Sequence, residues 1–83
     1  MNFSSLNFTD HKIKGATIAQ YVFDNNWKVS VVAGPEDSGL YGNIYQDTFE
    51  VAIYRPNRKM LDDVICWQTP VQISTIMRVI SML

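Results

Sequence analysis

The chain holds few side chains that could do chemistry, and their spacing does not bring them together. It has one histidine, His11, and one cysteine, Cys66, far apart in the sequence. A zinc site needs several Cys or His ligands at close spacing, and a nucleophilic thiol needs an adjacent base. Asp62 and Asp63 are neighbours, so in a strand their carboxylates would point to opposite faces. The sequence therefore predicts no catalytic residue, no metal ligand, no cofactor and no enzymatic activity.

The two isolated groups have simple structural interpretations. We expect His11, between Asp10 and Lys12, to be a solvated surface residue. We expect Cys66, beside Trp67, to be buried as a small apolar residue. The alternative for His11 is a general base that shares a pocket with an acid, in a hydrolase or nucleotide-binding factor.

Two segments have the residue types of an interaction site, and the first is the loop at residues 35–47. It is long for so small a domain, and loops of that length are often functional. It contains Tyr41, Ile44 and Tyr45, and tyrosine is enriched at protein interfaces. These three residues are candidate partner-binding residues. In the alternative, Leu40 and Ile44 only cover an open end of the core.

The second segment is the turn at residues 55–59, which holds three of the seven positive charges of the chain. Arg55, Arg58 and Lys59, together with Tyr54 just before them, are candidate partner-binding residues. Such a turn can contact phosphate or an acidic partner. In the alternative, it is a solvated turn that blunts one end of a sheet.

Composition limits the class of protein. The 83 residues are 47% hydrophobic and 18% charged, which is typical of one small globular domain. Seven basic residues against eight acidic ones give a net charge of −1, so nucleic acid is a disfavoured partner. A single cysteine fits a reducing compartment. The first residues lack the features of a secretory signal, and no apolar run could span a membrane, so we expect a cytoplasmic protein.

The periodicity of the sequence predicts strands followed by one helix. β-Branched and aromatic residues predict strands at residues 15–23, 27–33 and 48–55, with a weaker fourth strand at residues 64–67. Three Asp and Asn residues at positions 24–26 suit a hairpin loop between the first two strands. In the second strand, residues 27, 29, 31 and 33 should face a core, and Lys28 and Ser30 should face solvent.

The C-terminal part carries the clearest local signal. Thr69, Pro70 and Gln72 have the spacing of a capping box with proline at the first helical position. The apolar residues that follow fall on one helical face: Ile73, Ile76, Met77, Val79, Ile80 and Leu83. The predicted fold is a single α+β domain over residues 1–83. It has an antiparallel sheet of three to four strands, one C-terminal amphipathic helix on one face, and an irregular segment at residues 1–14.

One helix can cover only one face of a sheet. Either Tyr21 or Val22 should lie on the other face, together with Val32, Ala52 and Tyr54. An exposed face with apolar groups is typical of an oligomer or partner surface, so we also expect a homodimer.

Several short motifs occur in a characteristic order. They are residues 29–35 (VSVVAGP), 40–42 (LYG), 49–53 (FEVAI) and 63–69 (DVICWQT), followed by the helix. In this combination the chain, over residues 15–83, resembles small accessory proteins of tailed bacteriophages. Those proteins have a Ser-Val-Val strand, a Phe/Tyr-Glu-Val-Ala-Val strand and an Asp-x-Val-x-Gly-Trp/Tyr-x-Thr segment. Cys66 departs from the pattern by replacing its glycine, and the glycine usual near Glu50 is absent.

The resemblance implies a non-enzymatic factor that is made in the host bacterial cytoplasm and binds a host protein, in some cases a CRISPR complex. It carries over no catalytic residue. The leading hypothesis is a phage-encoded protein that inhibits a host or defence protein by steric occlusion. The alternative is a nucleic-acid-associated accessory protein that uses the basic turn at residues 55–59, with Lys12 and Lys14.

Overall fold

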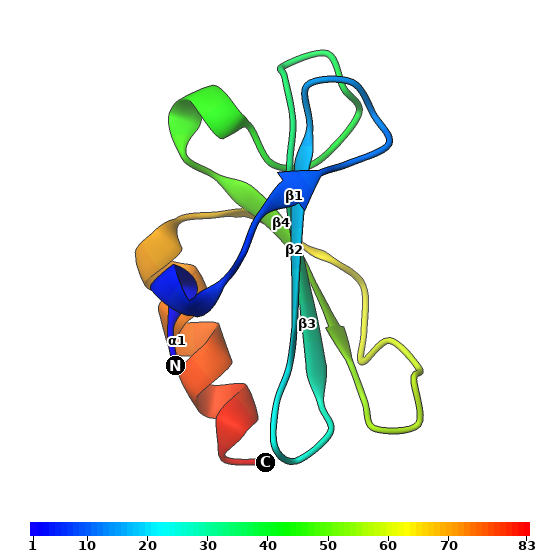
Figure 1. Cartoon of the computed structure of the whole chain (residues 1–83), viewed down its shortest axis with the longest axis vertical. Coiled ribbons are helices and arrows are strands. Elements are labelled where there is room, and N and C mark those ends of the chain that lie inside the picture. The colour runs from blue at the N-terminus through cyan, green and yellow to red at the C-terminus, as the bar shows by residue number, and fades with distance from the viewer.

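A computed structural model describes all of residues 1–83 and contains one antiparallel sheet with an α-helix packed on one face (Figure 1). The strands lie in the sheet in the same order as in the chain: β1 (Thr9–Asp10), β2 (Thr17–Val22), β3 (Lys28–Ala33), β4 (Phe49–Tyr54) and β5 (Ile65–Gln68). The helix α1 spans Pro70–Ser81, and two short 3-10 helices are η1 (Phe3–Ser5) and η2 (Ile44–Gln46). The predicted α+β class and the helix on one face are confirmed. None of the helices is both long and apolar enough to cross a membrane.

The predicted number of strands is wrong, because the sheet has five. The additional strand is β1, which pairs Thr9 with Ile18 and Asp10 with Thr17. Two polar residues show no alternation, so only the contact with β2 makes this segment a strand. The N-terminal segment that we expected to be irregular therefore contains both η1 and β1.

This N-terminal segment also supplies part of the core. Phe3 and Phe8 pack against Phe49 of β4, with ring centroids 5.1 and 5.5 Å from the Phe49 ring. Leu6, which lies between Phe3 and Phe8 in the sequence, is also buried. The backbone N–H of Phe3 donates to the Ser74 hydroxyl of α1 at 2.9 Å. The segment therefore covers the end of the layer between sheet and helix.

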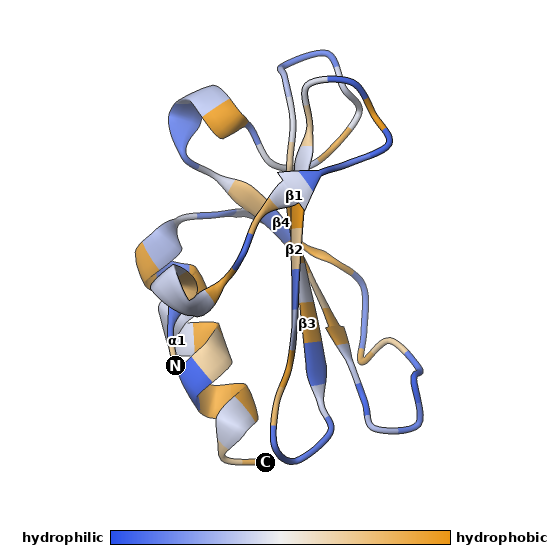
Figure 2. Ribbon diagram, viewed as in Figure 1, coloured by the Kyte–Doolittle hydropathy of each residue, from blue (hydrophilic) through white to orange (hydrophobic).

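The core-facing positions predicted for residues 27–33 are confirmed, but Ser30, predicted to face solvent, is buried. Val29, Val31 and Ala33 are fully buried on the side of α1, and Trp27 packs against the same cluster. Hydrophobic residues run along the central strands and α1, and the loops are mostly hydrophilic (Figure 2). The hairpin loop at residues 24–26 is also found, between β2 and β3.

The predicted capping box begins α1. The Thr69 hydroxyl accepts from the Gln72 backbone N–H at 3.3 Å, and the Gln72 side chain accepts from the Thr69 N–H at 2.8 Å. The buried residues of the helix are Ile73, Met77 and Ile80, with Ile76 partly buried.

Two residues of the predicted apolar face do not belong to the core. Val79 and Leu83 are exposed. Val79 lies at the margin of the apolar arc, where the sheet does not reach, and Leu83 follows the end of the helix at Ser81.

The face of the sheet opposite α1, which we call the open face, is less exposed to solvent than predicted. Its central residues Ser30, Val32 and Ala52 are buried although no helix covers them. The register places Val32 between the longer side chains of Ile18 and Glu50. Small residues of a central strand are thus shielded by their neighbours.

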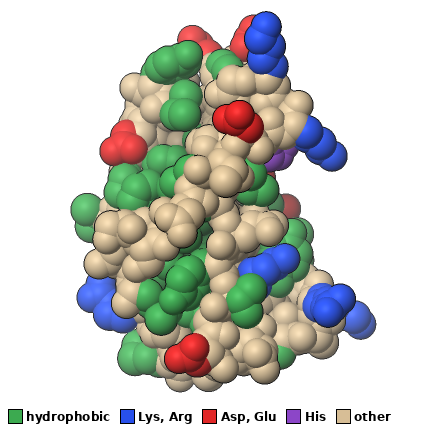
Figure 3. All heavy atoms as spheres, in the orientation of Figure 1, with side chains coloured by type: hydrophobic (Ala, Val, Ile, Leu, Met, Phe, Trp, Pro, Cys, Tyr) green, Lys and Arg blue, Asp and Glu red, His purple; other side chains and the backbone are tan.

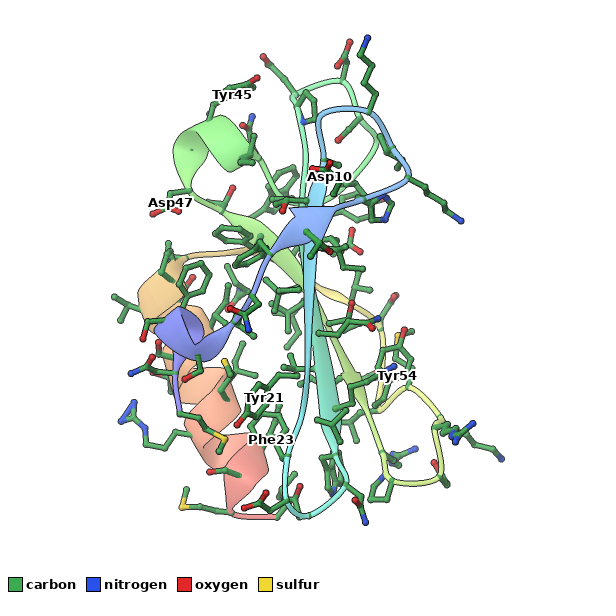
Figure 4. All side chains as sticks on the ribbon, in the orientation of Figure 1. Asp10, Tyr21, Phe23, Tyr45, Asp47 and Tyr54 are labelled. Carbon is green, nitrogen blue, oxygen red and sulfur yellow. The ribbon has the colours of Figure 1, made fainter.

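The register also shows that Val22, and not Tyr21, lies on the open face. Val22, Lys28 and Tyr54 are paired in one row across β2, β3 and β4, on the open face. Tyr21 instead lies on the α1 side, where its ring contacts that of Phe23 at 5.0 Å between centroids (Figure 4).

Candidate functional site

The structure divides the predicted partner-binding residues into two groups. Tyr41, Ile44 and Tyr45 belong to the loop before β4, and the others follow the end of β4: Tyr54, Arg55, Arg58 and Lys59. Tyr45 lies at the top of Figure 4 and Tyr54 in its lower half, in a molecule whose longest extent is 34 Å. One partner-binding site does not unite all seven residues.

At the first end, Tyr41 is paired with a residue that sequence reasoning did not select, Trp67. Their rings meet edge to face, with centroids 6.2 Å apart and an interplanar angle of 86°. The backbone N–H of Trp67 donates to the carbonyl of Tyr41 at 2.8 Å. Tyr41 is 52% exposed and Trp67 is 51% exposed. The Tyr41–Trp67 pair therefore presents two large aromatic side chains to solvent from a fixed backbone.

A bulge in β5 orients Trp67. Phe49 pairs with Gln68 and Val51 pairs with Ile65, so β5 has one residue more than β4 between these pairs. Trp67 lies in this interval with a φ of 56°, in the left-handed region. Glycine is the residue usually found in that conformation at a bulge. A tryptophan in that conformation raises the free energy of the backbone relative to glycine.

The loop that carries Tyr41 is held against β4. A Cβ on Gly42 would lie 2.6 Å from the Phe49 Cα and from the Glu50 nitrogen, so only glycine permits this approach. The Gly42 carbonyl accepts from the Gly34 N–H at 3.1 Å. The Tyr41 N–H donates to the Glu50 carboxylate at 3.1 Å. Tyr41 is therefore fixed by contacts on both sides.

The rest of the loop contains η2. The Asn43 side chain accepts from the Tyr45 N–H at 2.9 Å and begins this short helix. Tyr45 is 82% exposed and Ile44 is also exposed. Leu40 is half-buried, and its Cδ1 would lie 3.1 Å from a Cβ on Gly34. Neither of the two residues that could have covered the core packs against the core cluster.

At the second end is a hollow of about 590 Å³, which we call the basic hollow. Its lining residues come from the β2–β3 hairpin and from the end of β4: Val22, Asn26, Lys28, Tyr54, Arg55, Pro56 and Arg58. The Lys28 ammonium lies 4.8 Å from the centroid of the Tyr54 ring. Lys and Arg side chains gather at this corner, at the lower right of Figure 3. Lys59 belongs to the same turn but does not line the hollow.

The turn at residues 55–59 is closed by its own backbone. The Arg58 N–H donates to the Arg55 carbonyl at 2.8 Å, and the Arg55 N–H donates to the Lys59 carbonyl at 2.9 Å. Arg58 has a φ of 71°. The guanidinium of Arg55 also donates to the Leu61 carbonyl at 3.4 Å. These bonds fix the backbone of the turn that carries the two arginines.

The residues considered for chemistry lie elsewhere. His11 is half-buried rather than solvated, and its Nδ1 accepts from the Ile13 N–H at 3.0 Å. Cys66 is a free thiol that is half-buried rather than fully buried. It lines a second hollow, of about 470 Å³, with Asp62 and Asp63 among the other residues. No three His, Cys, Asp or Glu side chains come together as a metal-binding group.

Sequence reasoning missed Trp67 at one surface and Asn26 at the other, and it did not connect Val22 or Lys28 with the turn at residues 55–59. The alternation of β3 did place Lys28 outward. Its pairing with Tyr54 depends on the register of β3 and β4, which a long loop separates.

The two surfaces offer different kinds of contact. The Tyr41–Trp67 pair offers apolar area with polar tips, which suits another protein. The basic hollow offers positive charge, which suits an anion. Comparisons of the chain with protein-family models, with curated proteins and with solved structures found no match.

Proposed function

We propose that this chain is a small, non-enzymatic, phage-encoded binding protein that inhibits a host or defence protein in the bacterial cytoplasm by steric occlusion. A CRISPR complex is the defence target that the family resemblance suggests. The observation that carries the proposal is the left-handed, half-exposed Trp67 beside Tyr41.

Trp67 occupies a conformation that disfavours large side chains. The left-handed region costs a residue other than glycine about 1–3 kcal/mol. Trp67 remains 51% exposed, so burial in the fold offsets only part of that cost. Strain of this kind is common at functional sites, where the surroundings hold the residue in place. A partner that covers the indole supplies the missing burial.

The geometry of the Tyr41–Trp67 pair suits protein binding. Tyrosine and tryptophan dominate interface energetics, and truncating one central residue commonly costs about 2 kcal/mol or more. The backbone at both residues is already hydrogen-bonded, which lowers the entropy lost on binding. Tyr45, four residues after Tyr41 in the same loop, is 82% exposed. We therefore place the partner at this end of the sheet.

A capture experiment tests this placement. The tagged chain is expressed in bacteria with an active CRISPR system, and co-purifying proteins are identified by mass. Tyr41→Ala with Tyr45→Ala should lose the partner while keeping the thermal midpoint. Arg58→Glu with Lys59→Glu, a matched pair of exposed substitutions at the other end, should retain it. The reverse result, with added salt mimicking the charge reversal, would support the nucleic-acid alternative and exclude the proposal.

The mode of inhibition is tested with the purified target and the purified chain. Steric occlusion requires one bound chain for each blocked target, so inhibition of purified target should saturate at a fixed ratio of the two proteins. Inhibition that continues to completion at a small fraction of that ratio would indicate turnover and contradict a non-enzymatic role.

Self-association through the open face is a further part of the proposal. Val22, which is 61% exposed, and the half-buried Tyr54 would be covered by a second copy. Sedimentation velocity at micromolar concentration should show a species of twice the 9.5 kDa chain. A single species of 9.5 kDa would remove the homodimer and leave the partner surface untouched.

A further inference from the structure

We propose that the basic hollow binds a mononucleotide-sized ligand and holds its phosphate with Lys28, Arg55 and Arg58. These residues come from two elements that the register of β3 and β4 brings side by side. The inference goes beyond the protein-binding function, because the hollow lies at the opposite end of the sheet from the Tyr41–Trp67 pair.

The charges around the hollow are of one sign. Three of its seven lining residues are cationic and none is acidic. Asn26, at the hairpin tip, adds an uncharged amide that can donate to a phosphate oxygen. Arginine in particular matches the geometry of a phosphate group with two parallel N–H donors. The lining is therefore complementary to a compact dianion.

Two of the three cations have side-chain contacts within the chain. Lys28 lies over the Tyr54 ring, and Arg55 donates to the Leu61 carbonyl. The closed backbone of the turn fixes the main chain of Arg58, whose side chain is exposed. Because the ammonium of Lys28 covers one face of the Tyr54 ring, a nucleobase would not stack on that face. The base would instead lie against the exposed Val22 and Pro56 on the wall of the hollow. Because Val22 is also part of the face proposed for the homodimer, the nucleotide and a second copy would compete for it.

The size and isolation of the hollow favour a mononucleotide over a nucleic-acid strand. Its volume of about 590 Å³ lies within the usual range of small-ligand sites. Lys12 and Lys14 belong to the loop between β1 and β2, away from the β4–β5 loop (Figures 1 and 3). The molecule thus has no continuous basic track for a phosphate backbone. We therefore assign the hollow to a single nucleotide.

The test is an NMR titration of the isotopically labelled chain with adenosine monophosphate, with inorganic phosphate and with a short single-stranded oligonucleotide. Adenosine monophosphate should shift the amide signals of Asn26, Lys28 and Arg58 and leave those of Tyr41 and Trp67 unchanged. Arg58→Glu should weaken binding about ten-fold or more, since it removes a charge-assisted contact and adds repulsion. Lys28→Gln should weaken it in the same direction without touching the turn.

Lys59→Glu is the matched control, because it makes the same change of charge one residue from Arg58 and outside the hollow. It should weaken binding by less than about three-fold. Equal losses in Arg58→Glu and Lys59→Glu would overturn the site, since diffuse attraction would then explain the binding. Inorganic phosphate that binds as tightly as the nucleotide would overturn the nucleotide assignment. An oligonucleotide that binds more tightly than adenosine monophosphate would replace it with a nucleic-acid site.

Discussion

The side-chain amide of Asn25, at the tip of the β2–β3 hairpin, donates a hydrogen bond of 2.8 Å to the backbone carbonyl of Ile80 near the end of α1. The same amide donates to the Leu83 carbonyl at 3.1 Å, and its oxygen accepts from the Trp27 N–H. The last carbonyls of a helix have no partner within the helix. Asn25 therefore fastens the end of α1 to the sheet.

Asn25→Ala should lower the free energy of unfolding by about 1–2 kcal/mol, because two donated bonds are lost and a net bond contributes about 0.5–1.5 kcal/mol. Chemical denaturation measures this change. Asn25→Asp should destabilise at least as much, since a carboxylate cannot donate and opposes the negative end of the helix dipole. A more stable Asp variant would show that the amide bonds contribute nothing.

Removal of the helix cap should have a similar effect at the other end of α1. Thr69→Ala should cost about 0.5–2 kcal/mol, the usual loss for an N-cap residue. Thr75→Ala removes a hydroxyl that bonds only the Val71 carbonyl in an exposed position, and it should change stability by less than about 0.5 kcal/mol. The two variants are compared by their denaturation midpoints. Equal midpoints would contradict the role of the cap.

The buried and exposed sides of α1 should respond differently to truncation. Ile73→Ala should cost about 2–5 kcal/mol, because it opens a cavity where the side chain is fully buried. Val79→Ala, on the exposed margin of the helix, should cost less than about 0.5 kcal/mol. Thermal unfolding followed by circular dichroism distinguishes these outcomes, and a neutral Ile73→Ala would mean that α1 does not pack on the sheet.

The strain at Trp67 predicts that a glycine variant is more stable than an alanine variant, which is the reverse of the usual order in a strand. In a strand interior glycine is usually less stable than alanine by about 0.5–1 kcal/mol. At a φ of 56° the order should reverse, so Trp67→Gly should be more stable than Trp67→Ala by about 1 kcal/mol. Gln20, exposed on β2, is the control, where the alanine variant should be the more stable one. If alanine were preferred at both positions, Trp67 would not be strained.

Local sequence signals were sufficient for much of the fold. The capping box at Thr69 and the core-facing positions of β3 are set by near neighbours, and both were predicted correctly. The burial of Ser30 was not, because it depends on the strands on either side of β3. The strand β1 and the contacts of Phe3 and Phe8 were not predicted. They arise when the N-terminal segment meets β2, β4 and α1, and no periodicity within that segment signals them.

The candidate surfaces show the same division. Tyr41 and Arg58 stand out by residue type in their loops, so each could be selected from the sequence. Their neighbours Trp67 and Lys28 could not, because one depends on a bulge in β5 and the other on the register of two strands. The sequence shows a tryptophan two residues before the cap at Thr69, but it does not show that this tryptophan is exposed.

The order of the strands has a consequence for synthesis on the ribosome. Each strand from β2 to β5 pairs with the one made just before it, so the sheet can assemble as the chain emerges. The residues that cover its apolar side, Ile73, Met77 and Ile80, are translated last. A nascent chain that stalls before them would present Val29, Val31 and other core residues to the cell, and it would be a target for chaperones and proteases.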